Sequence, residues 1–413
     1  MIVFRIFDIG RVIVKISLDD LTKVGPGTLA GRYLRTFWIP VFRSEDLALG
    51  ASKPIRILGE EFTLYRGEGG RSHIVAPRCA HRLTRLHTGR VAGDGISCLY
   101  HGWKYDGTGQ CTFQPGENAE FTRNTKIAAY STQEYLGLIW GYFGEGEAPL
   151  LPKLSDFERP GLLTTATPEY WPCNFFNRID NAPDGMHVLF THQESTSRDG
   201  KVVENLSVDE LPIMESAETE FGVETKIQFG NLTGYFQFLM PFANILAATV
   251  GRLEGPADAP RAWRAEIHFR VPVDDEHFVS FGVVLIDLHG EEAARYLELR
   301  NEERQRVANP EGVADFFGQQ VLAGKMRISD MDPELGVRYT FQVEDYTVMV
   351  GQGAIPDRKK ERLGLCDKGT ALIRRVWMRE LQALADGRAL KNWTVPVGLV
   401  DKTQPQPSIA MAD

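Results

Sequence analysis

Residues 79–103 have the sequence CAHRLTRLHTGRVAGDGISCLYHGW, which contains two Cys–His pairs. One pair is Cys79 with His81, the other is Cys98 with His101, and sixteen residues lie between the pairs. In a two-iron, two-sulfide cluster, two imidazoles on one iron raise the reduction potential above that of a cluster held by four thiolates. The spacing therefore predicts a 2Fe-2S electron-transfer site, with both thiolates on one iron and both imidazoles on the other.

A structural zinc site is the alternative, because two thiolates and two imidazoles also satisfy tetrahedral zinc. The residues around the ligands distinguish a zinc site from an iron–sulfur cluster. The segments CAHR (79–82) and CLYHGWKYD (98–106) resemble the Rieske domain of ring-hydroxylating oxygenases, whose usual forms are CPHR and CxYHGW. Ala80 stands where that family usually has proline, and neither loop has the additional cysteine of respiratory Rieske proteins. The resemblance favours the iron–sulfur cluster over zinc.

The composition is that of a globular protein with more than one domain. The 413 residues are 43% hydrophobic and 24% charged, which fits two domains and neither a disordered nor a membrane-spanning chain. A formal net charge of -9 argues against a nucleic-acid partner. The three remaining cysteines, Cys111, Cys173 and Cys366, form no disulfide framework, and charged residues interrupt the apolar N-terminal stretch, so we expect a cytoplasmic protein without a membrane segment.

We predict an α+β fold in four parts. Residues 1–35 form an N-terminal extension and helix, and residues 36–150 form an all-β cluster domain rich in glycine and short β-branched runs. Residues 151–395 form the second domain, and residues 396–413 form a polar tail.

The second domain combines strands with amphipathic helices. Alternation in AEIHFRV (265–271) places Ala265, Ile267, Phe269 and Val271 on one buried strand face, which indicates an antiparallel sheet. Residues 291–309 and 370–386 have helical amphipathicity. We therefore expect a curved antiparallel sheet flanked by helices, of the helix-grip type. His268, His277 and His289 lie in or beside strands and are expected to face solvent.

A second group of metal-binding side chains is predicted at Asp184-x-x-His187-x-x-x-x-His192. Oxygen-activating ferrous iron is typically held by two histidines and one carboxylate, and His187 and His192 would be the imidazole ligands. A separation of five residues places two side chains roughly 140° apart on a regular helix. We therefore predict a break or a π-bulge between the two histidines.

This segment resembles the iron-binding signature of the Rieske non-haem iron oxygenases, with Asn181, Asp184, His187 and His192 at the matching positions. The resemblance implies that Asp184 is not a metal ligand. It would instead link the iron histidine of one subunit to a cluster histidine of the next subunit, with Asp180 as the second choice.

The resemblance also implies a downstream carboxylate ligand at the start of a helix. FQVEDYTVMVGQG (341–353) offers Glu344 and Asp345, and we choose Asp345, with Gln352 seven residues later as in the family pattern. Asp357 and Asp367 remain possible.

The resemblance implies the terminal oxygenase (α) subunit of a Rieske non-haem iron oxygenase, of the phthalate-dioxygenase type and similar to aromatic O-demethylases. It implies one 2Fe-2S cluster, one mononuclear Fe(II), O2, an aromatic substrate, a separate NADH-dependent reductase with or without a ferredoxin, and a homotrimer. We expect oxidative demethylation of a methoxylated aromatic, in a pocket lined partly by residues 234–246. The alternatives are ring hydroxylation or cis-dihydroxylation of an aromatic carboxylate, an electron-transfer protein without catalysis, and a zinc-stabilised binding module.

Overall fold

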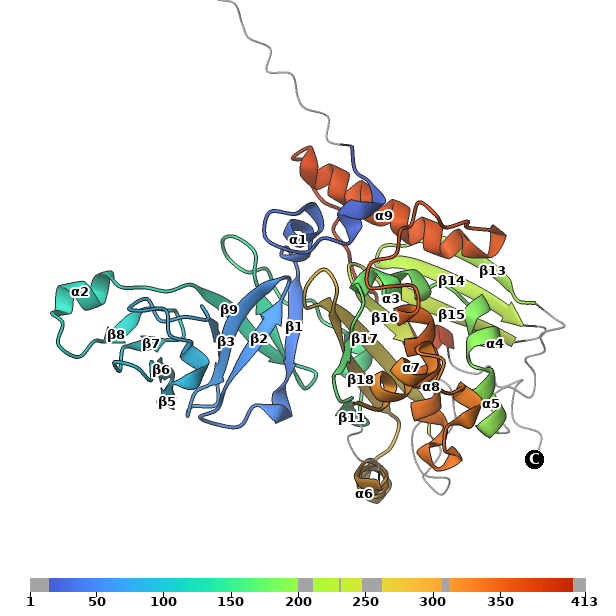
Figure 1. Cartoon of the computed structure of the whole chain (residues 1–413), viewed down its shortest axis with the longest axis horizontal. Helices are drawn as coiled ribbons and strands as arrows, with labels where there is room; N and C mark the ends of the chain where they lie inside the picture. The colour runs from blue at the N-terminus through green and yellow to red at the C-terminus, as the bar shows by residue number, and fades with distance from the viewer. Residues whose placement is uncertain (1–14, 200–210, 230–231, 247–261, 307–311, 404–413) are drawn as a thin grey trace, which may run out of the picture.

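The computed structural model describes residues 15–199, 211–229, 232–246, 262–306, 312–403. Two β-rich bodies lie side by side, and the C-terminal helix α9 crosses the top of the second body next to α1 (Figure 1). No helix in these ranges is both long and apolar enough to cross a bilayer.

The N-terminal domain is built on a six-stranded antiparallel sheet with the order β1-β10-β9-β4-β3-β2. Two of its hairpins turn through Leu58–Gly59 and Leu136–Gly137, and all four residues have positive φ. Such turns match the twist of the strands that they join. The strands are β1 (Trp38–Arg43), β2 (Ser52–Ile57), β3 (Glu60–Arg66), β4 (Ser72–Val75), β9 (Ala129–Tyr135) and β10 (Leu138–Tyr142).

A smaller four-stranded sheet extends from this domain, away from the second domain (Figure 1). Its strands are β5 (Arg90–Ala92), β6 (Gly95–Ser97), β7 (Lys104–Asp106) and β8 (Cys111–Phe113), and α2 (Ala119–Asn124) follows β8. Both Cys–His pairs belong to loops at this sheet.

The second domain has an eight-stranded antiparallel sheet with the order β11-β18-β17-β16-β15-β14-β13, and β12 also pairs with β18. The predicted α+β class, with a curved antiparallel sheet and flanking helices, is confirmed (Figure 1). The strands are β11 (Leu162–Thr165), β12 (Glu169–Trp171), β13 (Ile213–Glu218), β14 (Gly222–Phe229), β15 (Leu232–Leu239), β16 (Ala243–Leu246), β17 (Arg264–Pro272) and β18 (Phe278–Ile286).

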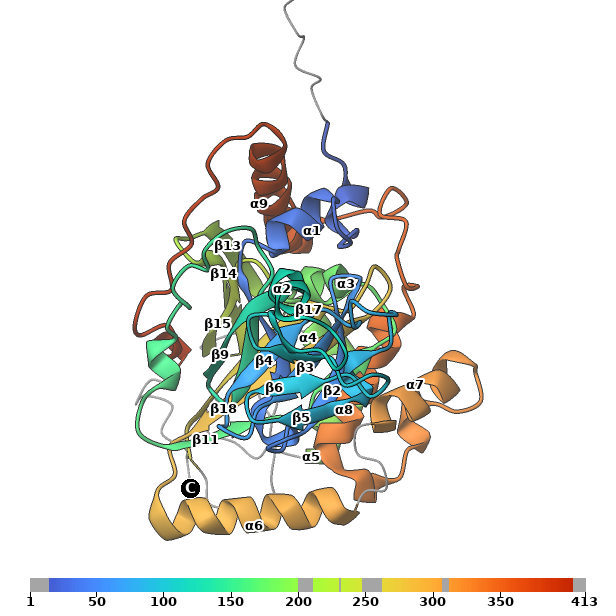
Figure 2. The same cartoon turned by 90° about the vertical axis from the view of Figure 1, so that its left-hand side faces the viewer.

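Helices cover this sheet on one face and at its ends (Figures 1 and 2). The α-helices are α1 (Leu29–Leu34), α3 (Phe175–Asn181), α4 (Met186–Thr191), α5 (Gln193–Asp199), α6 (Gly290–Arg306), α7 (Val313–Leu322), α8 (Gly336–Val350) and α9 (Lys368–Ala385). Single 3-10 turns are η1 (Leu18–Leu21), η2 (Ser44–Asp46), η3 (Leu86–Thr88), η4 (Ser155–Phe157), η6 (Ile328–Asp330), η7 (Pro333–Leu335), η8 (Leu365–Asp367) and η9 (Val400–Thr403). Helices α6 and α9 fall where amphipathicity predicts them.

Strand β17 separates two environments. The alternating apolar residues predicted to share one face are buried in the main core, where Phe269 packs edge-on against Trp140 of the N-terminal domain at 5.0 Å between ring centroids. Backbone hydrogen bonds from the β2–β3 turn add to this contact, because the Gly59 amide donates to Val273 at 2.8 Å. The opposite face of β17 carries polar side chains and faces α3.

Candidate metal centres

The two Cys–His loops have the same backbone geometry. The Cys79 amide donates to the Thr84 carbonyl at 2.9 Å, and the Cys98 amide donates to the Trp103 carbonyl at 2.8 Å. In each loop the cysteine carbonyl then accepts a bond from the amide four residues later, at 3.0 Å in both cases. The second loop needs Gly102, which has φ +71. Two equivalent turns thus present two Cys–His pairs side by side.

The four predicted cluster ligands divide by exposure. The cysteine side chains are buried, whereas both histidines are exposed, with their ring centroids 4.4 Å apart. Trp103 stacks on His81 at 4.5 Å, and the Tyr105 hydroxyl lies 3.3 Å from Cys79 Sγ. Buried thiols and outward imidazoles fit a cluster with one thiolate-bound iron inside and one imidazole-bound iron near the surface.

The mononuclear iron ligands predicted from sequence also lie together. One ligand atom from each of His187, His192 and Asp345 lies within 4.8 Å of the other two. The helix break that we predicted between the histidines is confirmed, because α4 ends at Thr191 and His192 has non-helical φ -94 and ψ 27 before α5 begins. The distortion is a break and not a π-bulge. It turns His192 back toward His187, at 5.5 Å between ring centroids.

The carboxylate comes from the interior of a helix, contrary to our expectation of a helix start. Helix α8 begins at Gly336, and Asp345 lies well inside it on the face toward α4 and α5. Asp345 Oδ1 lies 3.5 Å from His192 Nε2 and has no hydrogen-bond partner among the described residues. A buried carboxylate oxygen without a donor, facing two imidazoles, fits a two-histidine, one-carboxylate iron site. Asp357 and Asp367 lie outside this group.

Glu344 holds the other side of His192. Its Oε2 lies 3.0 Å from His192 Nδ1, and its Oε1 accepts the amides of Glu194 and Ser195, both at 3.0 Å. The Ser195 hydroxyl donates to Oε2 at 2.7 Å. A fully buried carboxylate in this position favours a proton on Nδ1, which leaves Nε2 to face Asp345 and a metal.

Arg178 of α3 pairs with Asp345, with Nη2 2.7 Å from Oδ2. Burial alone would raise the pKa of Asp345, but Arg178, His192 and His187 together hold that pKa below its usual value. Burial lowers the pKa of His187 despite the nearby carboxylates. The site therefore favours a charged carboxylate and a neutral imidazole, which are the ligand forms that a metal requires. Asn181, predicted from the signature, accepts a hydrogen bond from Arg178.

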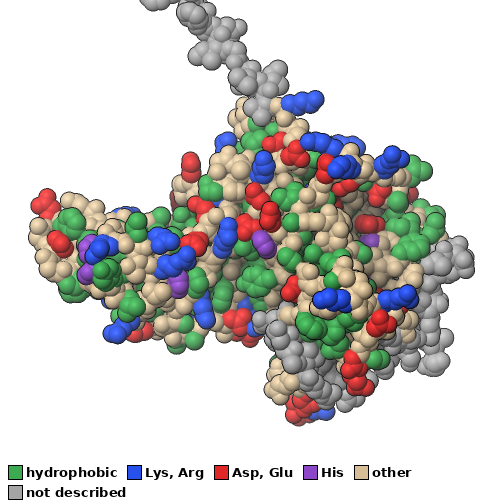
Figure 3. Space-filling model, in the orientation of Figure 1, with side chains coloured by type: hydrophobic (Ala, Val, Ile, Leu, Met, Phe, Trp, Pro, Cys, Tyr) green, Lys and Arg blue, Asp and Glu red, His purple; other side chains and the backbone are tan. Residues whose placement is uncertain are grey.

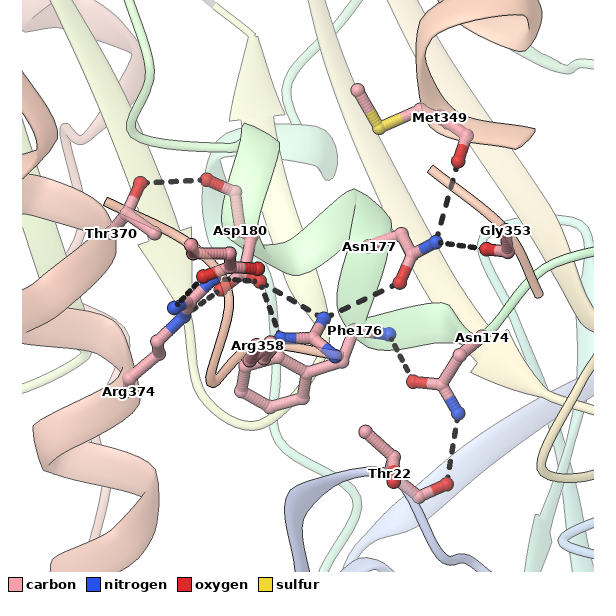
Figure 4. Close-up of polar contacts among 11 residues, drawn as sticks. Thr22, Asn174, Phe176, Asn177, Asp180, Met349, Gly353, Arg358, Thr370 and Arg374 are labelled. Atoms are coloured by element: carbon pink, nitrogen blue, oxygen red, sulfur yellow. Dashed lines mark hydrogen bonds and ion pairs between the residues drawn. The ribbon is translucent and has the colours of Figure 1, made fainter. Parts of the chain in front are cut away.

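The structure distinguishes Asp184 from Asp180. Asp184 is partly exposed. Its Oδ1 accepts a hydrogen bond from the Met186 amide at 3.0 Å, and its backbone carbonyl forms a hydrogen bond with His187 Nδ1. Asp180 instead pairs with Arg374 at 2.7 Å and with Arg358 at 3.0 Å (Figure 4). Both oxygens of Asp180 are thus bound inside this network, whereas Asp184 remains partly exposed.

Sequence reasoning missed two contributors to the candidate iron site. Arg178 lies one turn before Asn181. Nothing in the sequence indicated that it would be buried beside the predicted ligands, because an isolated arginine on a helix is usually at the surface. Glu344 was weighed only as a rival ligand to Asp345. Adjacent residues on a helix point about 100° apart, so the pair can reach two sides of one imidazole.

His268 was expected to face solvent, and this was wrong. Its side chain is mostly buried on β17, where Nε2 lies 3.1 Å from Glu266 Oε2. Period-two alternation correctly separates the two faces of the strand, but it cannot tell solvent from a polar interior.

Comparison with known proteins adds three findings. The model of the Rieske [2Fe-2S] domain family matches residues 37–131. The chain is 27% identical over 398 residues to the 5,5'-dehydrodivanillate O-demethylase oxygenase subunit of Sphingobium sp., covering 95% of this chain and 85% of that protein. It is 31% identical over 279 residues to the 3-chlorobenzoate-3,4-dioxygenase oxygenase subunit of Comamonas testosteroni, covering 64% and 61% of the two chains.

Solved structures share the fold. NdmA of Pseudomonas putida CBB5 superposes with a TM-score of 0.60 at 20% identity, covering 86% of this chain and 93% of that one. Dicamba monooxygenase superposes with a TM-score of 0.58 at 16% identity, covering 86% and 99%.

Proposed function

Because this chain belongs to the Rieske non-haem iron oxygenases, we propose that it is a terminal oxygenase that oxidatively demethylates a methoxylated aromatic compound. That it is an oxygenase acting on aromatic compounds follows from the family. The choice of demethylation is supported by the relative with the longest match described above, which is named as an O-demethylase and spans 95% of the chain.

The observation that carries the proposal is the triad of His187, His192 and Asp345, together with the two cysteine–histidine loops. An electron-transfer protein would need only the loops. A zinc-stabilised binding module would need neither this triad nor an Asp345 oxygen that has no donor among the described residues. The chain thus has one ligand set for an electron carrier and a second for an oxygen-activating metal.

The overall reaction consumes O2 and NADH. One oxygen atom is inserted into a methyl C–H bond of the substrate, and the other leaves as water with two electrons and two protons. In the resulting hemiacetal the bond between the aryl oxygen and the former methyl carbon breaks, and the hydroxyl proton passes to the aryl oxygen, which gives formaldehyde and a phenol. When bound, the mononuclear iron would supply oxygen activation and the cluster would supply electrons.

The protein's own residues would prepare this site. Glu344 orients His192 and fixes its tautomer, and the Asp184 carbonyl does the same for His187. Arg178 keeps Asp345 charged and in place. Glu344, His192 and Asp345 are buried, which would retain their orientation between turnovers.

We further propose that electrons cross between subunits of a head-to-tail homotrimer. The exposed imidazoles of the cluster loops lie at the end of the N-terminal domain that points away from the triad of the same chain (Figure 1). Figure 3 shows histidine side chains at that end, beside hydrophobic, basic and acidic ones. Leu83, Leu99 and Tyr100 are exposed there. Asp184 of the neighbouring subunit would accept a hydrogen bond from His81 or His101, and a ring satisfies every such contact.

A separate NADH-dependent reductase, with or without a ferredoxin, would reduce the cluster. The second candidate function is ring hydroxylation or cis-dihydroxylation of an aromatic carboxylate. It is favoured by the match to a chlorobenzoate dioxygenase subunit at 31% identity.

The test is oxygen uptake by the purified, iron-loaded protein with a reductase and NADH, against methoxylated, carboxylated and unsubstituted aromatics. We expect formaldehyde in a one-to-one ratio with oxygen from a methoxylated substrate. Ring diols without formaldehyde would support the second function, and uptake by none of the panel would contradict both.

Metal analysis supplies the control. His187→Ala should lower the iron content from about three to about two per chain and abolish turnover, whereas the exposed His289→Ala should change neither. Two irons in the wild type that survive His187→Ala would favour an electron carrier without catalysis.

A further inference from the structure

Two aromatic side chains that are easily oxidised, Trp171 and Tyr346, lie beside the triad. Trp171 is the last residue of β12, and Tyr346 follows the predicted ligand Asp345 on α8. Their ring centroids are 5.6 Å apart, and both residues are buried. Arg178, which pairs with Asp345, places its guanidinium carbon 5.9 Å from the centroid of the Trp171 ring. A single side chain therefore separates the indole from a predicted iron ligand.

The hydroxyl group of Tyr346 has a proton acceptor. It donates a hydrogen bond of 2.5 Å to Asp315 Oδ1 of α7, and it accepts one of 2.8 Å from the Gln319 side chain. Burial and the Asp315 carboxylate raise the pKa of Tyr346, so the phenol keeps its proton in the resting protein. A phenol loses an electron far more easily when its proton can move to a positioned base. Asp315 is exposed and can pass that proton on to water.

A pocket connects the aromatic pair with the surface. Trp171 and Tyr346 both line this pocket, together with Asp315 and the exposed Tyr170. It lies between β12 and the helices α7 and α8. Only 4% of Trp171 and 1% of Tyr346 is exposed, so bulk solvent hardly reaches either ring. A small molecule that entered the pocket would nevertheless lie against both of them.

A second buried pair, Tyr33 and Trp377, lacks these features. Its ring centroids are 5.2 Å apart, and it lies where α1 meets α9. The Tyr33 hydroxyl accepts a hydrogen bond from Trp393, and no carboxylate among the described residues accepts its proton. Neither member lines the pocket. Contact with the triad, a carboxylate acceptor and access to a pocket thus occur together at Trp171 and Tyr346.

We propose that Trp171 and Tyr346 form an electron path that protects the candidate iron site when it is oxidised without a substrate. Trp171 gives an electron to the oxidised site and regains one from Tyr346, whose hydroxyl proton passes to Asp315. A small ene-diol reductant in the pocket, of the class of ascorbate, then returns an electron and a proton to Tyr346. This further activity goes beyond demethylation and requires only that oxygen is activated at the triad.

The electrons and protons of this side reaction balance. NADH with one solvent proton supplies two electrons and two protons, and the electrons arrive through the cluster. Ascorbate supplies two more electrons in two passages along the path, together with two protons, and becomes dehydroascorbate. The four electrons and four protons reduce one O2 to two molecules of water. Without the path, the same oxidising equivalents would be left to react with the ligands and side chains around the triad.

The experiment supplies oxygen and electrons but no aromatic substrate. The iron-loaded protein receives a reductase, NADH and ascorbate, with catalase present to remove free peroxide. We expect ascorbate to be oxidised in proportion to the oxygen consumed. Samples frozen during turnover without ascorbate should show a tyrosyl radical by electron paramagnetic resonance.

Variants of the path should change both readouts. Tyr346→Phe should lose the radical, and its ascorbate oxidation should fall to the level of His187→Ala, which lacks a triad ligand. Asp315→Asn should slow ascorbate oxidation by about tenfold or more, as loss of a positioned base does. Tyr33→Phe is the matched control, because it makes the same change in the other buried pair, and it should keep both readouts.

Structural damage is distinguished by composition. Cluster absorbance and triad iron should be retained in Tyr346→Phe, and a variant that loses either is set aside in favour of Asp315→Asn, whose changed residue is exposed. Wild-type rates of ascorbate oxidation in Asp315→Asn, or an unchanged radical in a correctly loaded Tyr346→Phe, would overturn the inference.

The outcome is independent of the proposed demethylation. A wild type that releases formaldehyde from a methoxylated aromatic but gives neither a radical nor ascorbate oxidation would keep the proposed function and overturn the electron path. A wild type that shows both readouts but demethylates nothing would support the path and contradict the demethylase.

Discussion

The two candidate metal centres are built in opposite ways. The cluster loops lie within 25 residues of continuous sequence, on short strands and turns, with exposed imidazoles. The triad draws on α4, the break after it and α8, so that more than 150 residues separate His192 from Asp345, and His192 and Asp345 are buried. The first centre is a local structure at an edge of the molecule, whereas the second exists only once the large sheet and its helices have packed.

The difference in exposure between the two candidate centres follows from the partner of each, which is another protein for the cluster and an organic substrate for the mononuclear metal. A cluster that passes electrons to another protein has to keep an edge at the surface, and local turns are enough to hold it. A metal that oxidises an organic substrate needs a buried site, whose ligands must be oriented by further buried groups such as Glu344 and Arg178.

The largest predicted effect tests whether the centres are independent. Cys98→Ser should remove the cluster and its visible absorbance but leave iron binding at the triad, and Asp345→Asn should do the reverse. Each should reduce turnover to background, because electrons and oxygen activation are both required. Iron and acid-labile sulfide analysis checks the result, with the exposed Cys366→Ser as a control. Loss of both centres in either variant would show that they fold as one unit.

The same difference explains what the sequence could predict. The cluster loops were identifiable because all four ligands and their glycine turns lie within one stretch. The triad histidines were identifiable from their spacing, which requires the helix break that α4 shows. The carboxylate was chosen by resemblance, and its expected place at a helix start was wrong because α8 begins nine positions earlier.

Buried polar contacts were beyond prediction. Which acid meets Arg374 or Arg178 depends on how α3 packs against α9 and α8, and no local pattern encodes that packing. The polar face of β17 has the alternation of a strand with one solvated side. Only the tertiary fold places that side against helices.

The second prediction concerns Asp180, the second choice for the carboxylate that links two subunits. Asp180→Asn should destabilise the protein by about 3 kcal/mol, because the buried Arg358 and Arg374 would lose a shared counterion. Chemical denaturation measures the change. Asp357→Asn, which removes an exposed partner of Lys360, should change stability little. An Asp180→Asn protein of normal stability that fails only in turnover would restore Asp180 as the link.

Asp184→Asn should impair turnover and not stability, the opposite of the result expected for Asp180→Asn. Stability, cluster content and iron content should be retained, while turnover falls by about 10- to 100-fold because the link to the neighbouring cluster is weakened. Stopped-flow measurement of cluster reoxidation, in the presence of substrate and oxygen, locates the defect. Asp287→Asn breaks an exposed Asp–His pair at 3.1 Å and serves as the control. Unchanged reoxidation in Asp184→Asn would contradict the proposed route.

Glu344→Gln tests how far the buried triad depends on its support. An amide cannot accept the two backbone amides, the Ser195 hydroxyl and the His192 N–H as well as a carboxylate does, so we expect iron affinity to fall by about tenfold. Iron titration of the protein measures this, with cluster absorbance unchanged. Glu334→Gln alters an exposed acid just before α8 and should have no effect. Normal iron affinity in Glu344→Gln would assign Glu344 to the fold alone.

The smallest effect concerns the contact between the two domains. Asp274 lies in the turn after β17, 3.3 Å from Arg56 of β2. Burial alone would raise its pKa, but hydrogen bonds from His277 and the Glu276 amide, together with Arg56, hold that pKa below its usual value. A carboxyl group of this kind stabilises the folded protein above its unfolded pKa and loses that contribution as pH falls through the lowered value.

Asp274→Asn should therefore lower the thermal midpoint by about 1–2 °C near neutral pH, a small amount because Arg56 is largely exposed. The difference from wild type should stay constant down to about pH 4 and shrink below it, where the wild-type carboxyl begins to protonate. Asp19→Asn, which removes an exposed ion pair with Lys359, is the control. A difference that grows on acidification would mean that the carboxyl group opposes the contact between the domains, and that the cluster domain is held by apolar packing such as Trp140 against Phe269.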